Sequence, residues 1–277
     1  MFRSDSHTHT TYSSDVPKDR PASVAQMCAA AAELGLSYYA VTDHYDIEHF
    51  KTGILPPFPF QKWYQDVLAE RERYAGKMYV AAGLEYGEPY LLPEYYDETI
   101  HAAPFDLMLG SVHYIPGKTG YLSYPYQDMT EEARIALFEE YLDAWDELVH
   151  TPGIDVFTHP TYPLRYCLRK GIPFQVSCWE ERMRIMLRHI VEIGCGLEFN
   201  AATYRVQNTG IPDHTMETVL RWYKEVGGEI LTFASDAHFS KDIAAHHDFA
   251  MRVIREIGFR YIAVYHNHKP EFHKIEC

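Results

Sequence analysis

The sequence lacks the features that mark secreted, disulfide-rich or membrane-spanning proteins. Its cysteines are odd in number and include no CxxC pair, which fits neither a disulfide framework nor a thiolate zinc site. They are Cys28, Cys167, Cys178, Cys195 and Cys277. No apolar run reaches the roughly 18 residues that a membrane-spanning helix needs, and no stretch resembles a secretion signal. We therefore expect a reduced, soluble, cytoplasmic protein.

An excess of positive charge is also missing. Lys and Arg number 25 against 39 Asp and Glu, the formal net charge is -14 at pH 7, and no run is rich in Lys or Arg. Nucleic acid and anionic membranes are therefore not expected as partners. The excess carboxylates are instead available for cations. The 277 residues, 47% of them hydrophobic, suffice for a sizeable core, and we expect one domain over residues 1–277.

Short strand-like runs alternate with helix-length segments along the chain. The runs mostly lack polar alternation, as in strands that are buried on both faces. They cover residues 2–6, 37–42, 78–84, 105–112, 154–158, 196–199 and 230–234, with a possible eighth at 261–265. Helical patterns cover residues 21–34, 130–150, 183–193, 213–226 and 241–257, and Ser177 and Glu180 have the capping-box spacing before the third. Repeated β–α units of this kind predict a parallel α/β barrel.

Two long connections, residues 46–60 and 114–128, follow strand ends that carry histidine. Long loops in a compact domain are usually functional or mobile. We expect these two to form walls of a pocket, and the alternative is that they are disordered surface loops.

Histidine or carboxylate residues follow nearly every strand-like run. They are His7 and His9, Asp43 and His44, Glu85, His113, His159, Glu198, and Asp236 and His238. Alternate residues of a strand share a face, so His7 and His9 can aim at one point. Barrel enzymes collect their catalytic residues at the carboxyl ends of the strands. The pattern therefore predicts a metal site at that end of the barrel, built largely from six of the 16 histidines.

The motifs recur in a fixed order along the chain: HTH at 7–9, TDH at 42–44, GLE at 83–85, SVH at 111–113, THP at 158–160 and SDAH at 235–238. In this order they resemble the polymerase-and-histidinol-phosphatase (PHP) family. Residues 106–113 are especially similar to the stand-alone histidinol-phosphatases of that family. The resemblance implies a distorted (β/α)7 barrel that binds three divalent metal ions.

The resemblance also implies how the ligands divide among the ions. One ion would be held by His7, His9, Glu85 and Asp236, and a second by Glu85, His113 and His159, with Glu85 bridging the two. The third would be held by Asp15, His44 and His238, and many relatives have histidine in place of Asp15. Glu85, Asp236 and His238 are the residues to which we assign a catalytic role.

The chemistry of these ligands agrees with the resemblance. Imidazole and carboxylate ligands without thiolates suit zinc, manganese or iron at open catalytic positions. The carboxylate of Asp15 favours Mn²⁺ or Fe²⁺ over Zn²⁺ at the third position. Two ions bridged by a carboxylate can share a hydroxide and hold it in line with a phosphorus atom.

A phosphate monoester also needs hydrogen-bond donors. Arg165 and Arg205 follow the fifth and sixth strand runs, and the planar guanidinium group binds phosphate oxygens in pairs. The alternative for each is a solvated surface arginine, and Arg169 and Lys118 are weaker candidates. The family resemblance places Glu198 near the organic part of the substrate.

The leading hypothesis is hydrolysis of a small phosphomonoester, with L-histidinol phosphate giving L-histidinol and phosphate. The alternatives are a PHP-family protein-tyrosine phosphatase or other small phosphoesterase, an amidohydrolase-type hydrolase, and a metal-binding module without catalysis. The pairs His266 and His268, and His246 and His247, match no family motif. We expect them to be surface or tail histidines.

Overall fold

The computed structural model describes residues 2–205 and 214–276, and its centre is a parallel sheet whose strands follow chain order. Each strand on this path pairs in parallel with the next. The strands are β1 (Ser4–Asp5), β2 (Tyr38–Val41), β4 (Tyr79–Gly87), β5 (Leu107–Ser111), β6 (Val156–Phe157), β7 (Gly196–Asn200) and β8 (Leu231–Ala234). All seven expected barrel strands are therefore present, some of them shorter than the sequence suggested.

The last strand of this path returns to the first and closes the barrel. The amide of Ser6 donates to the carbonyl of Phe233 at 2.9 Å, and the amide of Asp236 donates to the carbonyl of His7 at 2.9 Å. Thr8 and Ala237 form an isolated parallel bridge beyond them. The predicted seven-stranded α/β barrel is confirmed, and its closing seam joins the HTH and SDAH motifs.

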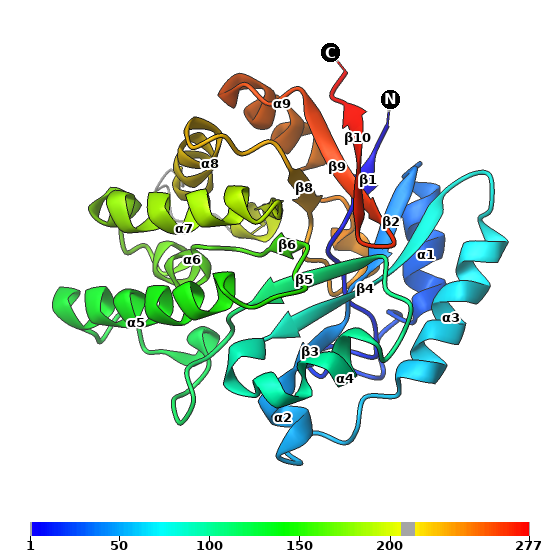
Figure 1. Ribbon diagram of the computed structural model, residues 1–277, viewed down its shortest axis with the longest axis horizontal. Coiled ribbons are helices and arrows are strands. Elements are labelled where there is room, and N and C mark those ends of the chain that lie inside the picture. The colour runs from blue at the N-terminus through cyan, green and yellow to red at the C-terminus, as the bar shows by residue number, and fades with distance from the viewer. Residues whose placement is uncertain (1, 206–213, 277) are drawn as a thin grey trace.

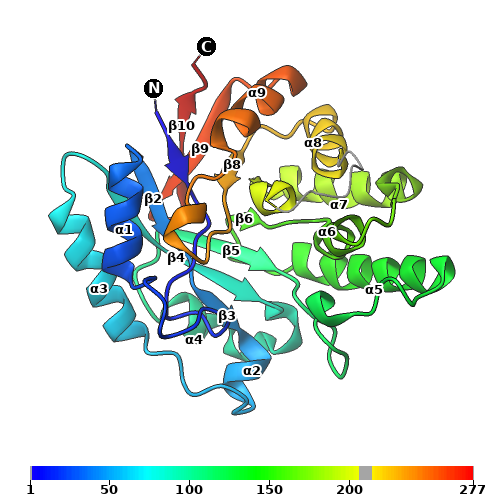
Figure 2. The same ribbon diagram turned by 180° about the vertical axis from the view of Figure 1, so that it is seen from behind.

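The segment expected as an eighth barrel strand lies outside the parallel sheet, and a different segment provides the eighth strand. An eighth strand of the sheet does exist, but it is β3 (His44–Asp46), which pairs with β4 so that His44 lies beside Glu85. The expected strand is β9 (Tyr261–His266), which pairs antiparallel with β10 (Lys269–Lys274) in a separate hairpin. Figure 2 shows this hairpin beside β1, outside the order of the parallel strands.

Helices cover the outside of the sheet, with α1 and α3 on one side and α5 to α8 on the other (Figure 1). They are α1 (Val24–Glu33), α2 (Ile47–Lys51), α3 (Phe60–Arg73), α4 (Tyr96–Ile100), α5 (Glu131–Val149), α6 (Tyr162–Arg169), α7 (Glu180–Glu192), α8 (Thr215–Glu225) and α9 (His247–Ile257). In the part of the chain that the structure describes, no helix combines the length and the apolar character needed to cross a lipid bilayer.

Three expected helix starts were wrong for local reasons. Helix α1 begins after Ser23, which forms a capping box with Gln26, and not at residue 21. The capping box expected at Ser177 does not form, because residues Val176–Trp179 make a 3₁₀ turn and α7 begins without a side-chain cap. Helix α9 begins at His247 and not at residue 241, because Ala244 and His246 have positive φ angles of 51° and 61° that interrupt helical geometry.

Side chains of the strands alternate between the barrel interior and the helices, so both faces are buried. Tyr39 and Val41 pack in the large cluster beneath the helices. The interior cluster contains Tyr38, Ala40, Ala81, Leu107, Leu109 and Val156, together with Val264 and Tyr265 of the hairpin. The hairpin therefore closes the amino end of the barrel, and the carboxyl end is left for polar residues.

Asp106, at the start of β5, connects the hairpin to the barrel. Its buried carboxylate accepts hydrogen bonds from the guanidinium of Arg71, the hydroxyl of Tyr79 at 3.0 Å, and the amides of Ala82 at 2.9 Å and Asn267 at 3.2 Å. One carboxylate thus satisfies donors from α3, β4 and the β9–β10 turn.

Replacing this carboxylate tests how much it contributes to the stability of the fold. We expect Asp106→Ala to lower the free energy of unfolding by about 3 kcal/mol, because a half-buried guanidinium, a tyrosine hydroxyl and two amides lose their acceptor. Urea denaturation of the metal-free protein measures the change. Asp146→Ala, on an exposed position of α5, is the matched control, and equal stability of the two variants would contradict the assignment.

Candidate metal centre

The carboxyl ends of the barrel strands bring together all nine residues that the sequence singled out as ligands. His7 and His9 follow β1, His44 begins β3, Glu85 lies on β4, and His113 and His159 follow β5 and β6. Asp236 and His238 follow β8, and Asp15 lies in the loop after β1. Seven of these side chains line one cavity of about 530 Å³. They are Asp15, His44, Glu85, His113, His159, Asp236 and His238.

Glu85 is the centre of the group. Its fully buried carboxylate divides the histidines into two sets. Oε2 faces Nδ1 of His44 at 2.9 Å, Nε2 of His7 at 3.1 Å and Nε2 of His9 at 3.4 Å. Oε1 faces Nε2 of His113 at 3.1 Å and Nε2 of His159 at 3.0 Å. This is the arrangement of a carboxylate that bridges two cation positions, each with imidazoles on its own side.

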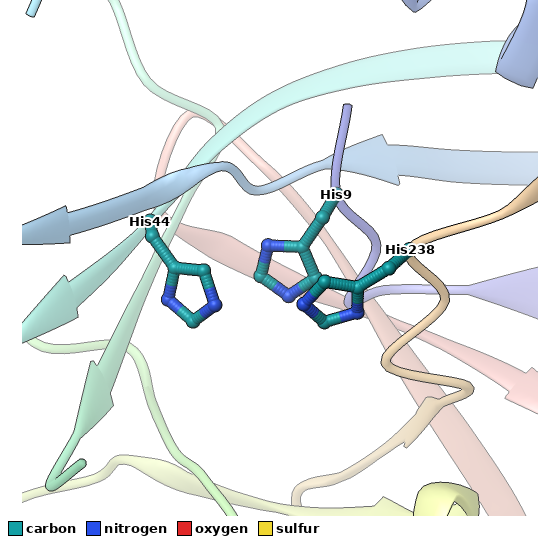
Figure 3. A group of neighbouring side chains, drawn as sticks. All are labelled: His9, His44 and His238. Atoms are coloured by element: carbon teal, nitrogen blue, oxygen red, sulfur yellow. The ribbon is translucent and has the colours of Figure 1, made fainter. Parts of the chain in front are cut away.

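A third set lies at the open edge of the site. Oδ2 of Asp15 is 2.8 Å from Nε2 of His238 and 3.6 Å from Nε2 of His44. Figure 3 shows the rings of His44 and His238 converging on His9, and the ring centroids of His9 lie 4.2 Å and 4.1 Å from theirs. His9 also approaches Oδ1 of Asp236 at 3.5 Å. The third set therefore adjoins the first through His9.

Four of the histidines have their ring orientation and tautomer set by an acceptor on Nδ1. His7 donates to Oε2 of Glu198 at 2.9 Å, and His113 donates to Oδ1 of Asp46 at 3.0 Å. His238 donates to the carbonyl of Asp236 at 3.0 Å, and His9 donates to Oγ of Ser13 at 3.1 Å. With Nδ1 occupied in this way, Nε2 is the atom of each ring that points into the site and is left to bind a metal ion.

These Nε2 atoms face carboxylate oxygens, which is unfavourable unless a proton or a metal ion lies between the two. Several of the buried atoms concerned have no hydrogen-bond partner: Nε2 of His7, Nε2 of His9, Nδ1 of His44 and Oε2 of Glu85. Ligand atoms of His7, His9 and Glu85, and likewise those of His44, Glu85 and His113, all lie within 4.8 Å of one another. The residues present therefore fit divalent metal ions with nitrogen and oxygen ligands.

The pKa values show the same unbalanced interaction between the buried carboxylates and imidazoles. Burial would lower the pKa of His113, but the carboxylates of Glu85 and Asp46 outweigh it and raise the pKa to about 10. Burial would likewise raise the pKa of Glu85, but His7, His44 and His113 hold it well below its ordinary value. For His9, burial and the neighbouring His238 and His44 lower the pKa to about 3. Without metal, the carboxylates draw protons onto some of the imidazoles.

Positive side chains line the other wall of the same cavity, as predicted for two of them. Arg165, 5% exposed, donates to Oδ2 of Asp236 at 3.2 Å, and its Nε and Nη2 have no partner. Arg205 donates to the carbonyl of Asp236 at 2.8 Å, and its Nη1 has no partner. Arg169 and Lys241 also line the cavity. Lys118 instead pairs with Glu140 at an exposed position outside it.

Glu198 lies in a different place from the one expected. It is fully buried and does not line the cavity. Oε2 accepts from His7, and Oε1 accepts from the amide of His159 at 3.0 Å and from Nδ2 of Asn200 at 2.7 Å. Both oxygens are therefore occupied, and this position argues against contact with substrate and for support of two histidines.

Sequence reasoning placed Asp43 after a strand but gave it no supporting role, and it missed Ser13 and Tyr162. Asp43 accepts from Ser13 Oγ at 2.7 Å, and that hydroxyl accepts in turn from His9. Tyr162 lies beneath the ring of His159, with centroids 4.8 Å apart, and beside the guanidinium of Arg165. The available signals were the position of Asp43 inside the TDH motif and the small spacing of Ser13 from His9.

The expected roles of the loops and remaining histidines are partly wrong. Residues 46–60 do not line the cavity: Phe50 and residues 55–59 border a separate hollow. Among residues 114–128, Leu122 alone lines the cavity of the metal centre. His247 is buried with its ring against Phe233, contrary to a surface position. His268 lies away from the cavity, in the hairpin turn, where it contacts Asp155.

A family model described as the PHP domain matches residues 5–202. The chain belongs to the PHP domain family. The match ends before β8, so Asp236 and His238 lie outside it. In this PHP protein, the closing seam of the barrel brings those two residues back to the site.

Two bacterial relatives match the PHP chain along most of its length. The histidinol-phosphatase of Lactococcus lactis subsp. lactis (strain IL1403) is 25% identical over 280 residues, covering 99% of this chain and 98% of the relative. A protein of Thermotoga maritima described as a probable histidinol-phosphatase is 22% identical over 260 residues, covering 94% of each chain.

A solved structure matches the fold. It is the crystal structure of histidinol phosphate phosphatase from Lactococcus lactis subsp. lactis Il1403 complexed with Zn, L-histidinol and phosphate. The two structures align with a TM-score of 0.79 at 23% identity, covering 97% of this chain and 98% of that one.

The position of Glu85 leads to a prediction about metal content. We expect Glu85→Ala to lose two bound metal ions together, because one carboxylate serves two sets of histidines. Elemental analysis after gel filtration in buffer with zinc measures the ions retained per chain. Glu94→Ala, at an exposed position, is the control. Loss of a single ion would show that Glu85 does not bridge.

The raised pKa of His113 leads to a prediction about pH. At pH 7 the metal-free site holds protons that an ion must displace, so affinity for zinc should rise with pH. The expected slope is about tenfold per pH unit for each proton displaced. Calorimetric titration in two buffers of different ionisation enthalpy counts the released protons. Affinity that does not change between pH 6 and pH 8 would contradict this expectation.

Proposed function

We propose that this chain is a metal-dependent phosphoric monoester hydrolase that converts L-histidinol phosphate into L-histidinol and phosphate, a reaction of histidine biosynthesis. One observation carries the proposal: a single cavity holds the cation-binding group around Glu85 together with the partly unpartnered guanidinium groups of buried Arg165 and half-buried Arg205. Such a combination suits a phosphate dianion. The histidinol-phosphatases among the relatives support the choice of substrate.

The metal centre is proposed to hold three divalent ions. His7, His9, Glu85 and Asp236 would hold the first, Glu85, His113 and His159 the second, and Asp15, His44 and His238 the third. Bound ions would supply a nucleophile from water at neutral pH and neutralise charge on the phosphate oxygens. Zinc, manganese and iron all suit these ligands, and the exposed carboxylate of Asp15 favours the harder ions at the third position.

The chain's own residues would bind and orient the substrate. Arg165 and Arg205 can donate to the phosphate oxygens from one side, while Asp236 keeps Arg165 in place. Leu122, Tyr166 and Phe239 supply apolar surface in the same cavity for the organic part of a small ester. Because β8 supplies Asp236 and His238, we propose that residues 1–277 act as one catalytic domain. A cytoplasmic location is part of the same proposal.

The other reaction classes have less support. Amidohydrolase-type sites usually place a bridging lysine or glutamate on the fourth barrel strand. The fourth strand of this barrel is β5, and it presents Ser111, whose hydroxyl donates to Glu85 at 2.7 Å. A protein-tyrosine phosphatase would use the same metal chemistry with a different ester. A non-catalytic metal module would need lost ligands, and every expected position holds a competent one.

Phosphate release tests the proposal directly. The protein is treated with a chelator and then assayed on L-histidinol phosphate before and after Zn²⁺, Mn²⁺ or Fe²⁺ is restored. We expect metal-dependent turnover with strong preference for this ester over a tyrosine phosphopeptide and a mononucleotide. Turnover of the other esters alone would overturn the substrate, and inactivity on all three by the metal-loaded protein would overturn the phosphatase proposal.

The arginines give a second prediction. We expect Arg205→Ala to raise KM about 10- to 100-fold with a smaller effect on kcat, because one or two charged hydrogen bonds to phosphate are lost. Steady-state kinetics of phosphate release measures both constants. Arg221→Ala, at an exposed position of α8, is the matched control. Unchanged KM and kcat for Arg205→Ala would remove this residue from the substrate site.

A further inference from the structure

We propose that Asp46 and Glu88 form a positioning pair that holds His113, and with it the second metal position, in place. Neither residue lines the cavity, and neither belongs to the ligand motifs. Asp46 contacts the ring of His113, and Glu88 contacts its main chain. The proposal rests on the metal centre described above, because it assigns a role to two residues behind one of its ligands.

Asp46 controls the imidazole ring. It ends β3, is 8% exposed, and accepts from Nδ1 of His113 at 3.0 Å. A carboxylate acceptor at Nδ1 fixes the orientation of the ring, so that Nε2 is aimed at Oε1 of Glu85 and is the nitrogen available to a metal ion. The position of Asp46 depends on Gly87 opposite, because a Cβ atom at Gly87 would lie 2.1 Å from Oδ1 of Asp46.

Glu88 holds the main chain at His113 in place. Its φ angle is 49°, a left-handed conformation that is unfavourable for a non-glycine residue. This conformation turns the side chain inward, where it is fully buried. Oε1 accepts from the amide of His113 and, at 3.4 Å, from the amide of Tyr114. A surface glutamate would need neither the burial nor the strained backbone, so the contact with His113 is the feature that accounts for both.

The two contacts act on different parts of one ligand. Asp46 comes from β3, Glu88 comes from the end of β4, and His113 follows β5, so three neighbouring strands are joined behind the ring. His113 lies on the Oε1 side of Glu85, with His159. Removing either member of the pair should therefore weaken one metal position and spare the two that depend on His7, His9, His44 and His238.

Metal affinity of the full chain tests this selectivity. Asp46→Asn and Glu88→Gln keep side-chain volume and replace each carboxyl group with an amide. We expect each to weaken one metal ion about 10- to 100-fold, with the other ions within about threefold of wild type. Affinities are measured by competition with a chromophoric chelator, using zinc alone as the probe. His113→Ala identifies which ion belongs to this ligand, and Asp97→Asn, exposed on α4, is the matched control.

A further variant separates positioning from folding. Gly87→Ala leaves both carboxylates in the sequence but obstructs Asp46, and we expect the same selective loss of one ion with circular dichroism and thermal unfolding unchanged in the metal-free state. Wild-type affinity for all ions in Asp46→Asn, or equal weakening of every ion, would overturn the positioning pair. Absence of zinc binding by the wild-type chain would instead overturn the metal centre itself.

Discussion

The buried carboxylate of Glu85 is the constraint on which the rest of the structure depends. A charge at 1% exposure is costly unless it is compensated, and here its two oxygens face imidazoles from separate strands. That requires several strand ends to meet within a few ångströms, which an open sheet does not provide. The seam between β1 and β8 supplies it by bringing the HTH and SDAH motifs together.

Around this carboxylate lies a second layer of acceptors, one behind each of several rings. Glu198, Asp46, Ser13 and the carbonyl of Asp236 each accept from an Nδ1 atom. Their common effect is to turn Nε2 of each of these four rings toward the site, where it can bind a metal ion. The site is therefore arranged for positive ions before any are bound, and the unpartnered arginine donors opposite it are arranged for an anion.

Stability and function are separated along the barrel axis. The amino end is closed by the β9–β10 hairpin, whose apolar side chains pack with the interior of β2 and β5. Asp106 joins that hairpin to the barrel, because its carboxylate accepts hydrogen bonds from α3, β4 and the β9–β10 turn. The carboxyl end carries strained or unpaired groups, including the positive φ angles of Glu88, His159 and Asp236. Such strain persists only where the surrounding packing holds it, and the closed amino end contributes to that packing.

The sequence by itself determined the order of strands and the barrel, because these depend on local composition, and the ordered motifs that resemble the PHP family determined the candidate ligands. Tertiary structure alone decided which oxygen of Glu85 faces which histidine, that Glu198 supports His7, and that residues 261–266 pair with residues 269–274 in a hairpin. It also placed β3, too short for a hydrophobic pattern, beside Glu85. These features depend on contacts between residues far apart in the chain, for which periodicity carries no signal.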